Sequence, residues 1–416
     1  MGEGKDAAVQ TNQASVKVSP YAWVILAIVF LASFIAPMAQ FKVTTLSEPL
    51  MAAFNLDPAS FGWLMSSLTI CGVLLAIPAA WMCGRMGEKV AILVSVACIG
   101  VGSLIGALTD NVALLFFSRA IEGCGIAFIG VAAPTAISMW FPEGKRALPL
   151  AIWCTWMPLG STVSMLIVPP VADAFGWRGA WWMCVICAVI VFFLVMALFK
   201  KPANASAETA VESVEAQKGF FMRGLSYLKN KEIWLLCIAF FCFNFVCNGV
   251  FMSYYPMYLE QGMAMTNAEA GAITSIMPIL TIIIMPIMGI VYDKVGHRKR
   301  FVMVAFALTA ATLAIAFMGN LGLVWASVII FGTMGGLVAS GTRPMTPEIM
   351  EKRGGGALAI AMGMSVMQIS QNLAPTIGSP LFGSMMMGMG WLGASVVLCV
   401  PLALIALIAM AFIKVK

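Results

Sequence analysis

The chain has 416 residues, of which 61% are hydrophobic and only 10% are charged, whereas a soluble domain carries roughly 25% charged residues. A water-soluble fold of this composition would lack the polar residues for its surface, so the composition excludes one. The formal net charge is +6, but the basic residues are confined to short segments between apolar blocks. We therefore expect the protein to lie in a lipid bilayer and to bind no nucleic acid.

Twelve apolar blocks follow one another along the chain. Each has about twenty residues, which suffices to cross a hydrocarbon core of about 30 Å at ~1.5 Å per residue. In lipid every backbone polar group must bond within the protein, so each block is expected to be a helix. The predicted spans are 21–42, 61–83, 90–109, 112–140, 147–172, 180–199, 233–255, 270–292, 301–319, 321–346, 357–380 and 391–413.

The basic residues indicate how the chain is oriented. Lys and Arg in short loops are retained on the cytoplasmic side of a membrane, and all but four of the 24 basic residues lie in alternate segments that include both termini. The four exceptions are Lys42, Arg119, Arg178 and Arg343. We predict a multi-pass protein of a bacterial cytoplasmic (inner) membrane with both termini in the cytoplasm.

The longest hydrophilic stretch divides the predicted helices into two groups of six. Residues 200–232 carry several acids and bases and are typical of a cytoplasmic linker. The sequence thus predicts a cytoplasmic tail at 1–20, a six-helix bundle at 21–199, the linker, a second bundle at 233–413 and a cytoplasmic end at 414–416. The tail has no cleavable leader pattern, so we expect the first helix to be retained.

The two groups of six are weakly similar in sequence. Shifting the chain by 209 residues pairs identical or similar residues at six positions: Gly62 with Gly271, Ser66 with Ser275, Arg85 with Lys294, Gly87 with Gly296, Lys89 with Arg298 and Gly123 with Gly332. An internal repeat of this kind predicts a solute path at the interface between the halves, near the middle of the membrane.

A loop motif closes the second helix of the second half. It reads Gly-Ile-Val-Tyr-Asp-Lys-Val-Gly-His-Arg-Lys and contains Gly289, Asp293, Lys294, Gly296 and Arg298. At this point the chain resembles the major facilitator superfamily, whose equivalent loops read Gly-x-x-x-Asp-Arg-x-Gly-Arg-Arg, with Lys294 in place of Arg. The resemblance implies an all-α membrane protein of twelve transmembrane helices in two pseudo-symmetric six-helix bundles, and a monomer.

The equivalent loop of the first half lacks the acid, and Gly84 stands in its place. Its remaining motif residues are Arg85, Gly87 and Lys89. The resemblance implies that the acid bonds to exposed amides at the start of a facing helix and holds the cytoplasmic side shut. Asp293 would then meet the chain near Ala147. The alternative is that the basic cluster at this loop only fixes topology.

A second motif lies inside the fourth predicted helix. Arg119 and Glu122, followed by two glycines, resemble the superfamily's Arg-x-x-Gln-Gly-x-Gly pattern with Glu in place of Gln. Residues three apart share a helix face and can pair, and ionisable groups within a span by default mark a solute or proton path. The alternative is a permanently bonded structural tie near the outer surface.

The charged residues inside the spans favour an anionic solute. Lys42, Arg119, Glu122 and Arg343 give three positive charges and one negative charge along the expected path, and fixed cations in a low-dielectric cleft attract anions. Arg343 has an alternative role, because a residue near the cytoplasmic end of its span can extend its charge to the interface.

Neutral polar residues on several predicted helices are candidates for further solute contacts: Gln40, Asn244, Asn248, Tyr254, Gln368, Gln371 and Asn372. The Gln-Phe-Lys ending of the first helix is also similar to bacterial permeases of the cyanate and small-anion kind. The sequence thus predicts a secondary active transporter of a small organic or inorganic anion, working by alternating access and driven by the gradient of the solute or of protons.

The residues leave two other functions open. A proton-driven multidrug or metabolite exporter usually carries Gly-x-x-x-Gly-Pro-x-x-Gly-Gly in its fifth helix, whereas this chain reads Met157-Pro-Leu-Gly160 there. A membrane sensor or scaffold on a transporter fold usually adds a soluble domain. An enzyme is not expected, because the only histidine is His297 and no catalytic cluster, phosphate-binding loop, cofactor motif or metal site is present.

Overall fold

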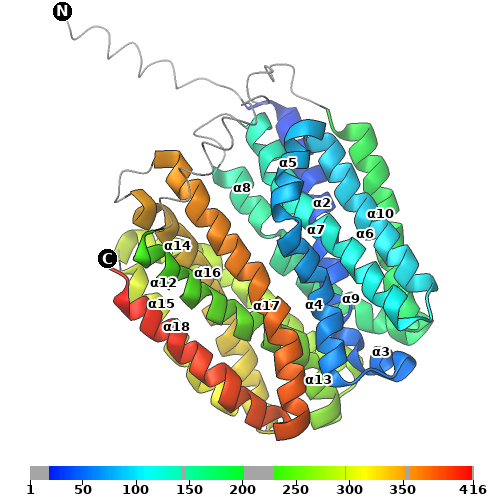
Figure 1. The fold of residues 1–416 in the computed structure, drawn as a ribbon, viewed down its shortest axis with the longest axis vertical. Helices are drawn as coiled ribbons and strands as arrows, with labels where there is room; N and C mark the ends of the chain where they lie inside the picture. The colour runs from blue at the N-terminus through cyan, green and yellow to red at the C-terminus, as the bar shows by residue number, and fades with distance from the viewer. Residues whose placement is uncertain (1–17, 142–146, 201–228, 296, 352–355, 415–416) are drawn as a thin grey trace, which may run out of the picture.

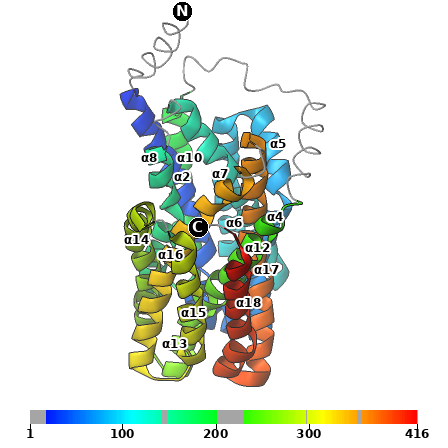
Figure 2. The ribbon, with the colours of Figure 1, turned by 90° about the vertical axis from the view of Figure 1, so that its left-hand side faces the viewer.

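The computed structural model describes residues 18–141, 147–200, 229–295, 297–351 and 356–414, and these form helices joined by short turns. Figures 1 and 2 show the helices of the first half as one bundle and those of the second half as another. The first bundle contains α2 (Pro20–Phe41), η2 (Thr44–Leu46), α3 (Ser47–Phe54), α4 (Pro58–Leu74), α5 (Ala76–Met86), α6 (Glu88–Leu108), α7 (Val112–Trp140), α8 (Ala147–Cys154), α9 (Trp156–Phe175) and α10 (Trp177–Leu198). The second contains α12 (Lys231–Asn244), η4 (Phe245–Phe251), α13 (Met252–Met263), α14 (Asn267–Val295), α15 (Arg298–Ile315), α16 (Leu321–Glu351), α17 (Gly356–Ala394), η5 (Ser395–Cys399) and α18 (Val400–Phe412).

A described helix, or a run of consecutive helices, covers each of the twelve predicted spans. Nine stretches of the described residues are long and apolar enough to cross a membrane. One of them, Gly363–Phe412, has 50 residues and contains two crossings that meet at Gly390. The shorter apolar helix α4 covers the second predicted span together with α5, and α15 covers most of the ninth.

Local sequence explains where the helices start and turn. Asn111 caps α7 by accepting hydrogen bonds from the amides of the first turn. Asp57 caps α4, and hydrogen bonds from Ser60 lower the pKa of this carboxyl. Gly87 and Gly176 connect antiparallel helices at φ of 79° and 71°, a backbone conformation that favours glycine.

Five spans differ from the simple helices predicted. The second is broken at Leu75 into α4 and α5, and the twelfth contains the π-helical turn η5. The fifth is broken at Thr155 into α8 and α9. Met157 and Pro158 lie in the first turn of α9, which begins at Trp156. The seventh contains the π-helical turn η4 between α12 and α13. The first continues beyond Lys42 into η2 and α3, which the hydrophobic pattern did not predict.

The two bundles contact each other mainly through α4 against α17 and α9 against α14. Glycine makes both contacts close. A methyl group on Gly62 would lie 2.6 Å from the carbonyl oxygen of Ser379 on α17, and one on Gly271 would collide with the carbonyl oxygen of Met165 on α9. The repeat that pairs Gly62 with Gly271 therefore corresponds to two equivalent close contacts between the halves.

The same equivalence holds inside each half. Gly123 of α7 lies against the carbonyl oxygen of Leu68 on α4, and Gly332 of α16 lies against that of Met277 on α14. Leu68 and Met277 are also 209 residues apart. The sparse sequence repeat thus preserves positions at which one backbone must approach another.

Among the described residues five hydrogen bonds join the two halves, three of them at one end of the molecule and two nearer the middle of α4 and α17. Asn267 Nδ2 donates to Thr45 O at 2.5 Å, and Ser47 Oγ donates to Glu260 Oε2 at 3.2 Å. The other three pairs are Tyr254 with Pro58, Ser66 with Pro375, and Thr376 with Thr69. We call this end, where η2, α3 and the last turn of α13 lie, the closed end. The opposite end, where α2 begins and α18 ends, is called the terminal end.

Candidate functional site

Three charged side chains form a compact cluster inside the first bundle, and we call Lys42, Arg119 and Glu122 the buried triad. All three residues are 0% exposed. Lys42 Nζ lies 2.5 Å from Glu122 Oε1, and Arg119 Nη1 pairs with Glu122 Oε2. The Arg119–Glu122 pairing is the one that the three-residue spacing predicts, whereas the pairing with Lys42 joins α7 to the end of α2.

Hydrogen bonds fix the carboxylate and the ammonium. Ser103 Oγ of α6 donates to Glu122 Oε1 at 2.5 Å and accepts from Lys42 Nζ at 3.0 Å. The ammonium also lies 4.5 Å from the centre of the Trp181 ring on α10, within range of a cation–π attraction. The triad and its contacts therefore come from four helices, α2, α6, α7 and α10, and no sequence motif marks Ser103 or Trp181.

Arg119 is held by backbone oxygens as well as by the acid. Its Nη1 donates to Ala39 O at 2.6 Å and its Nη2 donates to Gln40 O at 3.2 Å. Both acceptors lie near the end of α2, within a turn of Pro37. The Nε of Arg119 is buried and has no partner among the described residues. The Gln40 residue therefore contributes its carbonyl oxygen to this cluster, and its side chain is half-buried.

Glycines on α6 make room for the triad. A methyl group on Gly102 would lie 2.7 Å from Glu122 Cγ, and one on Gly106 would collide with the Trp181 ring. These two residues lie one turn apart on the face that α6 presents to α7. Small residues at this crossing thus let the two helices approach closely enough to bury the carboxylate between them.

The triad carries one unbalanced positive charge. Two cations share one carboxylate, in a place from which solvent is excluded. Burying a charge is costly unless it is paired and hydrogen-bonded. The arrangement therefore favours the entry of a further negative charge, or the loss of a positive one, whenever the cluster is opened.

The fourth predicted charge lies in the other half. Arg343 of α16 is half-buried, and its Nη2 donates to Gln371 Oε1 of α17 at 2.8 Å. It also lies within electrostatic reach of Cys154 on α8, which belongs to the first half. Gln371 is neutral, so the described partner leaves the charge of Arg343 uncompensated.

The remaining neutral candidates are divided between two regions. Gln368 is exposed and Asn372 is half-buried on the same stretch of α17 as Gln371. Asn248 donates to Asn244 Oδ1 at 2.8 Å, next to the π-helical turn η4. Such π-helical turns are frequent at functional sites.

Tyr254 lies at the closed end rather than beside Arg343. It is 0% exposed, and its hydroxyl lies 3.0 Å from Pro58 O and 2.8 Å from Ser379 O. The phenol therefore bridges α4, α13 and α17, and in this conformation it contributes to the contact between the halves.

A model of the Major Facilitator Superfamily matches residues 29–369, which is most of the chain. The chain belongs to the major facilitator superfamily. It is consequently a multi-pass membrane protein and a secondary transporter, and it is not an enzyme.

The curated relatives that the chain matches include two that are distant in sequence. The chain is 24% identical to "Hexuronate transporter" of Bacillus subtilis (strain 168) over 304 residues, which cover 71% of this chain and 72% of that protein. It is 23% identical to "Probable anion transporter 4, chloroplastic" of Oryza sativa subsp. japonica over 286 residues, which cover 65% of this chain but only 47% of the rice protein. This chain therefore spans about half the length of that relative.

A solved structure supports the fold of the transporter. It is the inward-facing and unoccupied conformation of a bacterial homologue of the human lysosomal transporter Spinster. The TM-score is 0.78 over 95% of this chain and 97% of that chain, at 15% sequence identity. The predicted all-α membrane fold of the superfamily is thereby confirmed.

The loop residues of the transporter make bonds within each half. Lys89 Nζ donates to Met196 O near the end of α10 at 2.9 Å, and Lys299 Nζ donates to Ala411 O and Ile413 O near the end of α18 at 2.8 and 2.6 Å. Arg298 Nη1 pairs with Glu348 of α16 at 2.5 Å. Cations at a helix C-terminus are favourable because the last carbonyls carry partial negative charge.

The other residues of the predicted gating motif are less informative. Arg85 and Lys294 are exposed, Gly87 makes the turn into α6, and a methyl group on Gly289 would meet no atom within 4 Å. The side chain of Asp293 and the whole of Gly296 lie outside the described part of the chain. The latch that the resemblance implies for Asp293 stays a prediction.

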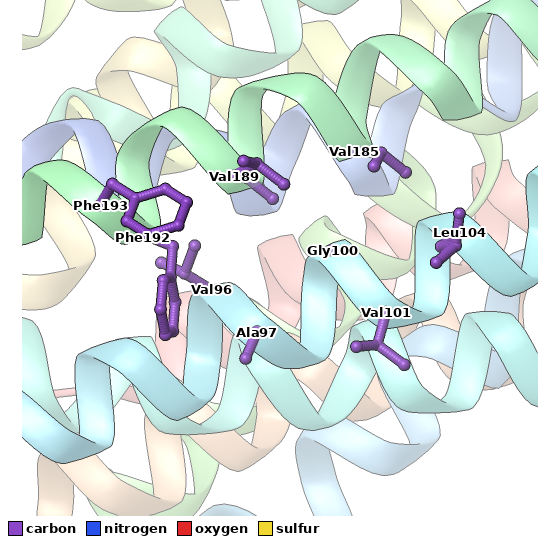
Figure 3. Close-up of a pocket in the computed structure, with 10 residues that line it drawn as sticks. Val96, Ala97, Gly100, Val101, Leu104, Val185, Val189, Phe192 and Phe193 are labelled. Carbon is purple, nitrogen blue, oxygen red and sulfur yellow. The ribbon is translucent and has the colours of Figure 1, made fainter. Parts of the chain in front are cut away.

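A groove on the surface of the transporter contains none of the charged candidate residues. It has a volume of about 320 Å³ and lies between α6 and α10 (Figure 3). Its lining is apolar throughout: Val96, Ala97, Gly100, Val101, Leu104, Val185, Ala188, Val189, Phe192 and Phe193. A groove without polar groups cannot orient an ionic solute. Among the described residues, no group of three or more His, Cys, Asp or Glu side chains is placed to hold a metal.

Proposed function

We propose that this transporter carries a small organic or inorganic anion across a bacterial cytoplasmic membrane by alternating access, with the terminal end in the cytoplasm. The orientation rests on the basic residues, of which all but four lie in the predicted cytoplasmic segments. The two anion-related relatives support the anionic class of solute.

The single observation that carries this proposal is the uncompensated charge of Arg343. A half-buried guanidinium between the halves has a neutral amide as its described partner. Arginine can bind a carboxylate or a similar anion through two parallel hydrogen bonds. Gln371 would hold the guanidinium in position for such an anion, and Gln368 and Asn372 on the same helix supply further hydrogen bonds.

The buried triad is proposed as the proton-coupling element. While Glu122 is ionised it holds both Lys42 and Arg119. A proton on Glu122 would remove the negative charge and leave two cations to attract an anion. Protonation and anion binding would then favour each other, which is the behaviour that a proton–anion symporter requires.

We further propose that the described conformation is closed toward the outside and represents one state of a rocking cycle. Three of the five hydrogen bonds between the halves lie at the closed end, and the other two lie nearer the middle of α4 and α17. In the opposite state these bonds would break, and Asp293 would hold the cytoplasmic side shut as the resemblance implies.

The anion proposal is tested by ligand-induced stabilisation of the purified transporter. The panel contains inorganic anions, small mono- and dicarboxylates, a hexuronate and lipophilic cations. A ligand that binds only the folded protein raises its stability by about 2.7 kcal/mol at a concentration of 100 Kd. We expect stabilisation by one class of anion in the wild type and its loss in Arg343→Gln. Stabilisation by lipophilic cations alone would refute the anion proposal and favour an exporter.

The coupling proposal is tested in vesicles that contain the purified transporter. Wild type should accumulate the stabilising anion when an inward proton gradient is imposed. Glu122→Gln should lose this accumulation while retaining exchange of labelled for unlabelled anion. Retained accumulation in the variant would reject the coupling role of Glu122.

A further inference from the structure

A carboxylate with an unpartnered oxygen is buried between the halves at the closed end. Glu260, in the last turn of α13, is 7% exposed. Its Oε2 accepts a hydrogen bond from Ser47 Oγ of α3 at 3.2 Å. Its Oε1 is buried and has no hydrogen-bond partner among the described residues. The side chain thus faces the other half of the transporter with one acceptor unsatisfied.

A second unsatisfied acceptor belongs to the same contact. Asn267, at the start of α14, donates through Nδ2 to Thr45 O, but its Oδ1 is buried and has no partner among the described residues. Thr45 and Ser47 are two residues apart on the chain. Two side chains of one half therefore meet the same short segment of the other half with an excess of acceptors over donors.

The charged groups around Glu260 do not stabilise its ionised form. Helix α13 packs mainly against η2, η4, α14 and α17, and Tyr254 also joins it to the start of α4, where the titratable group is another acid, Asp57. Neither η2 nor α17 contains a charged residue, and the titratable side chain of η4 is the thiol of Cys247. On α14 the nearest acid by sequence is Glu269, which is exposed and bonded to Thr266. On α3, Glu48 is exposed and adds a like charge.

The charged and titratable groups on α13 itself lead to the same conclusion. Tyr254, Tyr255 and Tyr258 are its other titratable residues, and each donates to, or accepts from, a backbone group. The buried cations of the first half among the described residues, Lys42 and Arg119, are both paired with Glu122. An ionised carboxylate in such surroundings lacks both water and a cation, and burial without a partner disfavours the charged form.

We propose that Glu260 is a proton-binding site whose occupancy controls the closed end: the side chain binds a proton from the outer solution when the halves come together and returns it when they part. One proton converts Oε1 from an acceptor to a donor in a contact that has an excess of acceptors. This inference rests on the alternating access proposed above, but not on the identity of the solute.

The direction of the effect follows from linkage. If closure binds a proton, acid on the outer side favours closure and alkali favours separation of the halves. One proton changes the ratio of closed to separated molecules by at most about tenfold per pH unit. The proton that Glu260 binds returns to the outer solution from which it came. Glu260 therefore regulates the opening of the closed end, and this role is distinct from the coupling role proposed for Glu122.

The test measures the distance between the halves without any solute. Spin labels are attached through a non-natural amino acid at Ala53 of α3 and Met389 of α17, both exposed, so that the native cysteines are kept. Pulsed electron resonance on the full-length transporter in lipid nanodiscs then gives the closed fraction between pH 5 and pH 9. We expect this fraction to fall with rising pH in the wild type and to be high and independent of pH in Glu260→Gln.

Two further variants make the test decisive. Glu48→Gln removes the exposed neighbouring acid and should keep the wild-type pH response. Ser47→Ala removes a donor that favours the ionised form, so it should keep the response with a midpoint at higher pH. A wild type without pH response, or a Glu260→Gln variant that retains it, would overturn the proposal. A closed fraction that changes with sodium concentration at fixed pH would also overturn the proposal, because the site would then bind a metal cation. None of these outcomes depends on anion binding, so failure here is distinguishable from failure of the proposed function.

Discussion

Removing the carboxylate of the buried triad should destabilise the transporter far more than removing one of its cations. Glu122→Gln keeps the size of the side chain but leaves Lys42 and Arg119 as two unbalanced charges at 0% exposure. Lys42→Met removes one cation and leaves Arg119 paired with Glu122 at zero net charge. The two substitutions therefore change the charge of the same site in opposite directions.

The expected magnitudes follow from what each change leaves unpaired. Breaking a buried ion pair by removing one partner costs about 3–5 kcal/mol when a charge is left behind. In Lys42→Met, Ser103 still donates to Glu122, and a methionine sulfur beside the Trp181 ring regains about 0.3–1.5 kcal/mol. We expect the free energy of unfolding to fall by about 3–5 kcal/mol for Glu122→Gln and by no more than about 1.5 kcal/mol for Lys42→Met.

The measurement is equilibrium unfolding of the purified variants in mixed micelles, followed by tryptophan fluorescence at one pH. Because both variants alter the same cluster, they share any effect of the micelle on the measured free energy. Equal losses in the two variants would show that hydrogen bonding, and not charge balance, stabilises the triad. A Lys42→Met variant that is the less stable of the two would refute the reasoning outright.

Three further predictions concern solute binding and gating. Arg343→Gln should weaken binding of the stabilising anion by about 10- to 100-fold, the value of one charge-assisted hydrogen bond, with Arg343→Lys between it and the wild type because lysine lacks the planar fork; calorimetric titration measures both, and unchanged affinity would remove Arg343 from the site. Gly62→Ala should reduce transport at least tenfold because its Cβ would lie 2.6 Å from the carbonyl oxygen of Ser379 on α17, whereas the Cβ of Gly72→Ala on the same helix meets no atom within 4 Å and that variant should transport normally; equal activity of the two would contradict the close contact. Asp293→Asn should increase labelling of cysteines introduced near the cytoplasmic mouth if the acid is a latch, and unchanged labelling would defeat that assignment.

The sequence was sufficient to predict the class of fold. Apolar blocks of membrane-spanning length predict the transmembrane helices, because the bilayer sets their length, and the resemblance of the loop motif at Gly289 indicates the superfamily. The repeat also had a structural basis, since Gly62 and Gly271 lie at equivalent contacts between the halves. Such positions are visible in sequence because glycine has no substitute where two backbones meet.

The contacts of the site were less predictable. The Arg119–Glu122 pair follows from helical spacing, but Lys42 is 80 residues from Glu122, and only the packing of α2 against α7 brings them together. Ser103 and Trp181 lie in apolar spans without any local motif. Glu260 was not selected because an acid near the end of a span is usually solvated, and its burial depends on η2 and α3, which no hydrophobic period predicts.

The lysine bonds at the terminal end bear on how the transporter moves. Lys89 fastens the last helix of the first bundle to the loop after its second, and Lys299 does the same in the other bundle. Ties of this kind make each set of six helices a stiff unit. Bending would then occur at the break at Thr155, at the π-helical turn η4 and at the helix crossings lined by glycine. At these places helices can hinge or slide while each six-helix unit stays intact.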